Sequence, residues 1–351
     1  MGRSVRLLVV AALVVLGGCG SVVRDDAIVF NCFDDVGARA CRINSNGSGF
    51  VELYPDVTVT RGPVLSPDRR WVSIDLGLGD PAGRGQGFLI LDSEGEEVTF
   101  IHRGTAKLVG TGAVWSPDSQ DVLFSAAGEV VVVSVADGDR EVVELSSSEF
   151  VDDMAVAPDG RRVAAVLRPN PPNEGDLVPS GSRLVVADLI TGAVVPVDSV
   201  SDPGTSVGLL DWSPDGSVLA VLSGNRGALV LVDTESWGVV GVVDSGLGER
   251  TLSGPSWSPD GDLLAYVRLS AVVVYDVAGG TSMEITRDPI QVASGAPSWS
   301  PDGEWLVVAV YHAGDRDYGL MTVRPDGGDA ERITRGVEGA GAQGQGWPMW
   351  S

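Results

Sequence analysis

The chain has little of the residue types from which most enzyme sites are built. Its 351 residues include two His, three Cys and a single Lys, Lys107. Neither His has a second His or a Cys at ligand spacing, which argues against a zinc site. The Gly-x-Ser-x-Gly stretch at 204–208 precedes another strand-like run, whereas a hydrolase nucleophile elbow leads into a helix and needs a triad His. We therefore predict no catalytic residues, no metal and no cofactor.

Positive charge is also scarce. Asp and Glu number 48 against 24 Lys and Arg, which gives a net charge of −24. A strongly acidic body argues against nucleic acid and against anionic lipid as ligands. The acidity itself is explained most simply as a device for solubility.

The first eighteen residues differ from the rest of the chain. Arg3 and Arg6 precede an apolar run, Leu7–Leu16, that is too short to span a bilayer. This is the pattern of a secretory signal peptide, and we predict one over residues 1–18. Leu16-Gly17-Gly18-Cys19 resembles the lipobox of bacterial lipoproteins, which implies an acylated Cys19 and an extracytoplasmic protein held on the cell membrane by lipid. The alternative is an ordinary cleavage site with an incidental Cys.

If Cys19 carries lipid, Cys32 and Cys41 remain as a pair in an oxidising compartment, and we predict a disulfide between them. The alternative is two reduced thiols. Residues 19–26 form the predicted lipidated tether, and its seven residues after Cys19 reach at most about 25 Å. Removing residues 1–18 removes two Arg and no acid, so the net charge of the mature chain is −26.

One five-residue motif, Trp-Ser-Pro-Asp-Gly, recurs along the remaining chain. It is complete at 212–216, 257–261 and 299–303, altered at 65–69, 115–119 and 156–160, and its first two residues stand at 350–351. A period of roughly 40–55 residues marks a repeat architecture. Ser, Pro and Asp favour a type I turn, and Gly accepts the left-handed conformation that follows. Arg69 and Ser119 replace this Gly, so we expect those two turns to be strained or differently shaped.

Each motif lies between strand-like apolar runs, and each repeat contains four such runs. Four short strands per repeat are typical of a β-propeller blade. The motif, with the Leu-Ala-Tyr of 264–266, Gly279-Gly280 and Ile285-Thr286, resembles the WD-like repeat of TolB-type propellers. The resemblance covers residues 27–351 and implies an all-β propeller of four-stranded blades, although TolB itself has six blades and a separate N-terminal domain.

Counting strands from both ends favours seven blades, with six or eight as alternatives. The chain opens with outer strands and closes with an inner one, so the C-terminal strand is predicted to complete the first blade. A ring closed in this way has no open sheet edge. Five of the nine Trp stand at the motif position, which predicts packing between blades.

In a propeller, the longer loops gather on one face, where binding usually occurs. Arg side chains in these loops are candidate contacts to an anionic ligand, together with one Trp outside the motif position. These candidates are Arg84, Arg103, Arg226, Arg250, Arg268, Arg287 and Trp347. Solvated loop charges are the simpler interpretation of each Arg.

Two functions remain open. The first is a lipid-anchored binding or scaffold module for a cell-envelope protein or a cell-wall component, with no role for nucleic acid. The second is a propeller hydrolase or lyase with its site at the central channel. Three or more carboxylates or His meeting near the channel axis would favour the enzyme.

Overall fold

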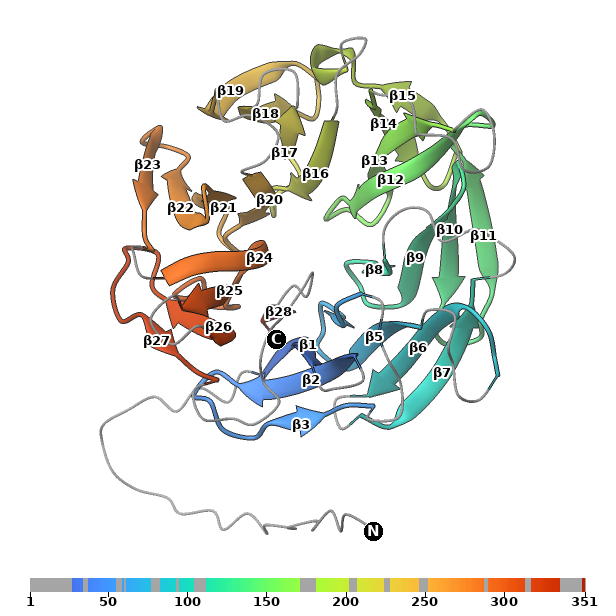
Figure 1. The fold of residues 1–351 in the computed structure, drawn as a ribbon. Helices are drawn as coiled ribbons and strands as arrows, with labels where there is room; N and C mark the ends of the chain where they lie inside the picture. Colours follow the sequence, from blue (N-terminus) through green and yellow to red (C-terminus); the bar gives the residue numbers. More distant parts are fainter. Residues whose placement is uncertain are drawn as a thin grey trace.

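In a computed structural model, the chain forms a ring of seven four-stranded antiparallel sheets (Figure 1). The structure describes residues 27–33, 37–54, 59, 61–76, 83–92, 95–103, 112–170, 181–201, 207–223, 228–245, 252–286, 290–312, 317–334 and 349–350. One short 3-10 helix, η1 (Asp198–Val200), interrupts the strands. No helix in these residues is long and apolar enough to cross a membrane. The predicted seven-bladed all-β propeller is confirmed.

Each blade consists of four strands, which follow one another from the channel outward. Blade 1 contains β28 (Met349–Trp350), β1 (Ala27–Phe33), β2 (Ala38–Asn44) and β3 (Val51–Glu52). Blade 2 contains β4 (Val64–Leu65), β5 (Trp71–Leu76), β6 (Gly87–Asp92) and β7 (Glu97–His102). Blade 3 contains β8 (Val114–Trp115), β9 (Asp121–Ala126), β10 (Glu129–Ser134) and β11 (Arg140–Glu144).

The remaining blades follow the same plan. Blade 4 contains β12 (Glu149–Val156), β13 (Arg162–Pro169), β14 (Arg183–Asp188) and β15 (Val194–Pro196). Blade 5 contains β16 (Val207–Trp212), β17 (Val218–Ser223), β18 (Ala228–Asp233) and β19 (Val239–Asp244). Blade 6 contains β20 (Leu252–Trp257), β21 (Leu263–Arg268), β22 (Ala271–Asp276) and β23 (Thr281–Glu284). Blade 7 contains β24 (Ile290–Trp299), β25 (Leu306–His312), β26 (Asp317–Val323) and β27 (Glu331–Arg332).

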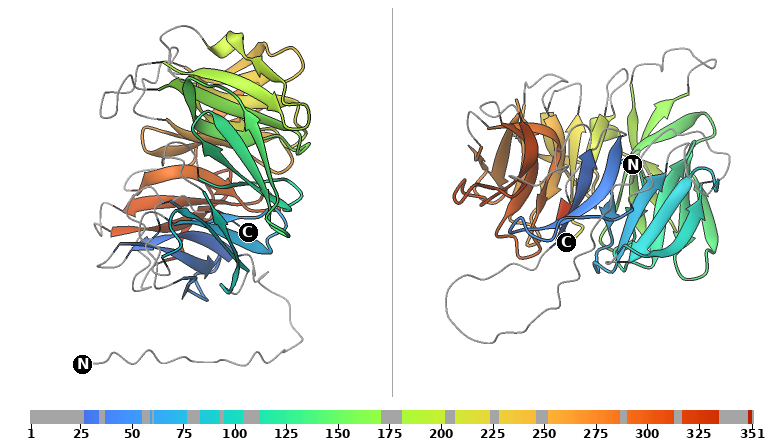
Figure 2. Two further views of the ribbon diagram at one scale, coloured as in Figure 1. Left: turned by 90° about the vertical axis from the view of Figure 1, so that its right-hand side faces the viewer. Right: turned by 60° about the horizontal axis from the view of Figure 1, so that its bottom comes forward.

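The ring closes where the two ends of the chain meet. β28 pairs with β1, and Trp350 stands opposite Ile28. Trp212 stands opposite Leu219 in the same way within an uninterrupted blade. In addition, the Trp350 backbone N–H donates to Ser298 Oγ of blade 7 at 3.1 Å. The predicted closure is therefore confirmed (Figures 1 and 2). Its register repeats that of blade 5, whose inner strands are joined by a motif turn.

The motif turns are held by their own side chains. Ser213 Oγ donates to Asp215 Oδ1 at 2.6 Å and accepts from Val218 N at 2.9 Å. Asp215 Oδ1 also accepts from Ser217 N at 3.0 Å. The same three bonds recur in the motifs that contain Ser66, Ser116, Ser258 and Ser300. Since every partner lies within five residues, these turns are specified locally.

The two turns without Gly keep the common shape. Arg69 and Ser119 adopt φ of 63° and 62°, close to the 72° of Gly216. Of the two expected outcomes, the structure shows strain without a different shape, because a side chain at positive φ is unfavourable. Ser119 has a compensation, because its buried hydroxyl accepts from the Asp68 backbone N–H of blade 2 at 2.9 Å.

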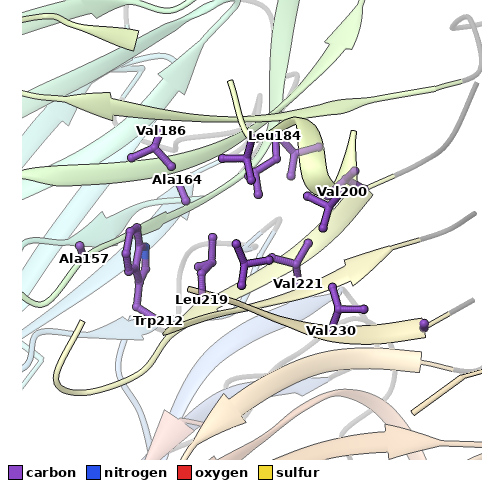
Figure 3. Close-up of a cluster of buried hydrophobic side chains, with 14 residues drawn as sticks. Ala157, Ala164, Leu184, Val186, Val200, Trp212, Leu219, Val221 and Val230 are labelled. Carbon is purple, nitrogen blue, oxygen red and sulfur yellow. The ribbon is translucent and has the colours of Figure 1, made fainter. Parts of the chain in front are cut away.

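The hydrophobic core is divided into clusters that lie between neighbouring blades. Figure 3 shows the cluster between blades 4 and 5, where Trp212 packs with Ala157, Ala164 and Leu219. Corresponding clusters occupy the other six blade interfaces, including the one between blades 7 and 1. Trp212 Nε1 also donates to the Ala155 carbonyl of blade 4 at 3.1 Å. Trp115, Trp257 and Trp299 make the corresponding bond to the preceding blade, so the predicted packing role of the motif Trp is confirmed.

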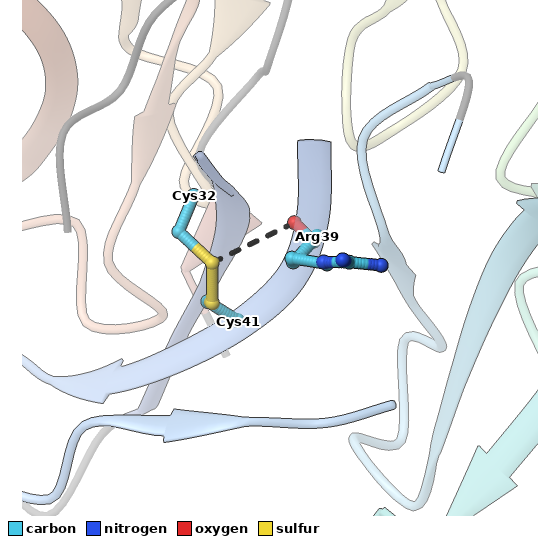
Figure 4. The surroundings of a disulfide bond; sticks show 3 residues. All are labelled: Cys32, Arg39 and Cys41. Carbon is cyan, nitrogen blue, oxygen red and sulfur yellow. Dashed lines mark hydrogen bonds between the residues drawn. A yellow bond between two sulfur atoms is a disulfide. The ribbon is translucent and has the colours of Figure 1, made fainter. Parts of the chain in front are cut away.

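The predicted disulfide joins Cys32 and Cys41 in blade 1, with a Cα–Cα distance of 5.8 Å (Figure 4). The two Cys do not face each other directly. Cys41 stands opposite Phe30, and Cys32 stands opposite Arg39, so the bond runs diagonally across β1 and β2. It lies in the blade that both ends of the chain build.

Candidate functional site

The ring has two faces that differ in their connections. The motif face carries the motif turns and the turns between the third and fourth strands of each blade. The loop face carries the connections from second to third strand and from each blade to the next. Residues outside the described set fall mainly in connections that leave from the loop face, as in 171–180 and 335–348.

The wall of the central channel is uneven. Among the described residues, the inner strands of blades 4 to 7 have six to ten residues, whereas those of blades 2 and 3 have two each. The longer strands, β12, β16, β20 and β24, each contain a register shift. Bulges often stand beside functional sites because they redirect side chains. The bulges in β12, β16, β20 and β24 therefore make the channel wall of blades 4 to 7 the first candidate site.

Two carboxylates on this wall have perturbed acidity. Burial raises the pKa of Asp153 to about 6 and that of Asp211 to about 7. Asp211 Oδ2 accepts from the Trp257 N–H of blade 6 at 2.9 Å, so it links two inner strands. Hydrogen bonds from the backbone of Leu209 and Leu210 partly offset the shift of Asp153. A carboxyl group with a pKa near neutral can donate or accept a proton under physiological conditions.

Sequence reasoning misses the significance of these two residues. In the sequence, Asp152-Asp153 offers at most oxygen ligands for calcium, and Asp211 belongs to no recognised motif. The available signal is the place of Asp211 directly before a motif Trp, where the other motifs carry an apolar residue or Ser. Within the described part of the chain, no three His, Cys, Asp or Glu side chains come together as metal ligands.

The predicted Arg contacts have partners within the fold. Arg103 is buried and lies 3.2 Å from Asp75 Oδ2, with its guanidinium 4.5 Å from the Phe88 ring centroid. Arg268 lies 3.2 Å from Asp244 Oδ2 and thereby joins blades 5 and 6. These contacts give both residues a structural role at the loop face.

Arg84 lies elsewhere. Its guanidinium stands over Phe100 of the outermost strand β7 and lies 2.6 Å from Glu97 Oε1, which places it on the rim of blade 2. The remaining predicted contacts, Arg226, Arg250, Arg287 and Trp347, lie outside the described residues, as does Cys19.

Known structures share this architecture at low sequence identity. An oligogalacturonate lyase in complex with manganese is 16% identical, with a TM-score of 0.62, covering 90% of this chain and 87% of that one. The oligogalacturonate lyase of Vibrio parahaemolyticus is 16% identical, with a TM-score of 0.64 and coverage of 88% and 86%. TolB from Acinetobacter baumannii is 16% identical, with a TM-score of 0.51 and coverage of 93% and 67%.

No protein-family model matches the chain, and no curated protein matches its sequence. The structural similarities therefore support a TolB-like propeller fold and go no further, because one fold hosts many activities.

Proposed function

We propose that this chain is an extracytoplasmic lipoprotein, anchored through Cys19, whose propeller binds a cell-envelope protein or a cell-wall component at its loop face. The disulfide between Cys32 and Cys41 is the observation that carries the location, because such bonds persist in oxidising compartments. The signal-peptide pattern of residues 1–18 points to the same compartment. Loops held on a rigid ring suit a binding role.

Membrane extraction followed by intact-mass measurement tests the anchor. We expect a chain that begins at acylated Cys19, and a Cys19→Ser variant that leaves the membrane fraction. An unmodified wild-type chain in the soluble fraction would contradict the proposal.

Site-specific photo-cross-linking in living cells tests the binding surface. Ser147 lies in the loop-face connection between β11 and β12, and Ala136 lies in the motif-face turn between β10 and β11; both are exposed. A photoreactive residue at 147 should form adducts with an envelope protein or with peptidoglycan fragments, and one at 136 should form fewer. Equal adducts at both positions would place binding elsewhere.

An enzyme with its site at the channel is the second candidate, and Asp153 and Asp211 favour it because their pKa values suit acid–base chemistry. Incubation of the purified protein with oligogalacturonate, with and without manganese, tests this directly. An unsaturated elimination product that no longer forms in an Asp211→Asn variant supports a lyase. An unchanged substrate in every condition rejects activity on oligogalacturonate.

A further inference from the structure

The point at which the chain enters the ring sets the direction in which the ring faces. Within every blade, the second strand begins at the motif face, as β17 does directly after its motif turn at 213–216. β1 is the second strand of blade 1, and its register with β28 matches that of β17 with β16. Ala27, the first residue of β1, therefore lies at the motif face, beside the inner strand and close to the channel.

From this position we infer that the anchored ring holds its motif face toward the membrane and its loop face away from it. The inference rests on the proposed anchor at Cys19. Residues 20–26 reach at most about 25 Å. A six-residue strand rises about 20 Å, so a tether that followed blade 1 to the loop face would use nearly all of its length. Facing the membrane with the motif face requires no such detour.

Charge is distributed unequally between the two faces. Among the described residues, acidic side chains far outnumber basic ones in the turns of the motif face. The acids are Asp68, Asp92, Glu96, Asp118, Asp121, Asp137, Asp139, Asp159, Asp188, Asp215, Asp233, Glu235, Asp260, Asp262, Asp276, Asp302, Glu304, Asp326 and Asp329. The bases are Arg69, Arg70, Arg140, Arg161, Arg162 and Arg324. Among the described residues of the loop face, two ion pairs join an acid to an Arg, Arg183–Glu149 and Arg268–Asp244.

This asymmetry determines how closely the ring approaches the lipid. An acidic face repels an anionic membrane, and the repulsion is screened beyond about 8 Å at physiological ionic strength. A gap of that size is well within the reach of the tether. The ring therefore stands off the bilayer with its acidic motif face inward, and the loop face is presented to partners beyond the membrane.

Energy transfer to a labelled membrane tests the orientation. The disulfide leaves no free thiol in the ring, so Ala136→Cys and Ser147→Cys each introduce a single labelling site on opposite faces of blade 3. Each variant is purified in its full acylated form, labelled with a donor dye, and reconstituted into vesicles that contain a rhodamine-labelled lipid. We expect higher transfer from position 136 than from position 147. Equal transfer would indicate a ring that stands on edge, and higher transfer from 147 would indicate the reverse orientation; either result overturns the inference.

Two further measurements test the charge repulsion and distinguish a failure of the anchor from a failure of the orientation. In vesicles with phosphatidylglycerol, transfer from position 136 should increase when the salt is raised from about 0.01 M to about 1 M, because the Debye length falls from about 30 to about 3 Å; in neutral vesicles it should stay constant. If mass measurement finds no acyl group, the proposed anchor has failed. The orientation is then tested by the same comparison on vesicles with nickel-chelating lipid, using a His tag in place of residues 1–19.

Discussion

Replacing Trp350 with Ala tests whether the last residues of the chain really complete the ring. The Trp350 side chain is 7% exposed and belongs to the buried cluster that contains Ile28, Phe30 and Val307 of blades 1 and 7. A buried Trp removes about 150–250 Å² from water, which at about 25 cal/mol per Å² corresponds to about 4–6 kcal/mol. Trp-to-Ala substitutions in cores cost about 3–5 kcal/mol, and we expect that loss in the free energy of unfolding.

The loss is large against a typical total stability of about 5–15 kcal/mol. Each kcal/mol lowers the melting temperature of a large domain by about 2–4 °C, so calorimetry should show a decrease of about 6–20 °C. Trp257→Ala is the matched control, because Trp257 holds the same motif position inside the chain and is equally buried. A Trp350→Ala variant that melts like the wild type, while Trp257→Ala melts early, would refute the closure. Deletion of residues 347–351 should abolish cooperative unfolding altogether.

Three other substitutions test single contacts. Because the folded-state pKa of Asp211 is raised to about 7, its contribution to the free energy of unfolding should fall as the pH rises from about 4 to about 7. Urea titrations at pH 5 and pH 8 should show this dependence in the wild type and not in Asp211→Asn. Replacing both Cys32 and Cys41 with Ser opens a loop of about ten residues and should cost about 2–3 kcal/mol in the same assay. Arg69→Gly should stabilise the chain by about 0.5–1 kcal/mol, since φ is positive there, whereas Ser119→Gly should show a smaller gain or a loss because it removes the bond to Asp68 N.

The candidate sites illustrate how far sequence reasoning reaches in this chain. The positions of Arg103 and Arg268 near the loop face could be predicted from strand order. Their carboxylate partners could not, because Asp75 and Asp244 stand 28 and 24 residues away and meet them only through strand pairing and blade packing. The raised pKa of Asp211 could not be predicted either, because it depends on burial against the inner strand of the next blade.

By itself, the sequence determined the repeat and the chemistry of the Ser-Pro-Asp turns, and it favoured seven blades over six or eight. The turn chemistry depends on residues within a few positions of one another, as the bonds among Ser213, Asp215 and Val218 demonstrate. Only the tertiary structure decided the diagonal geometry of the disulfide, the bond between Asp68 N and Ser119 Oγ of neighbouring blades, and the bulged half of the channel wall. Each of these depends on groups that approach one another when strands pair and blades pack side by side, and a repeat in the sequence carries no record of those distances.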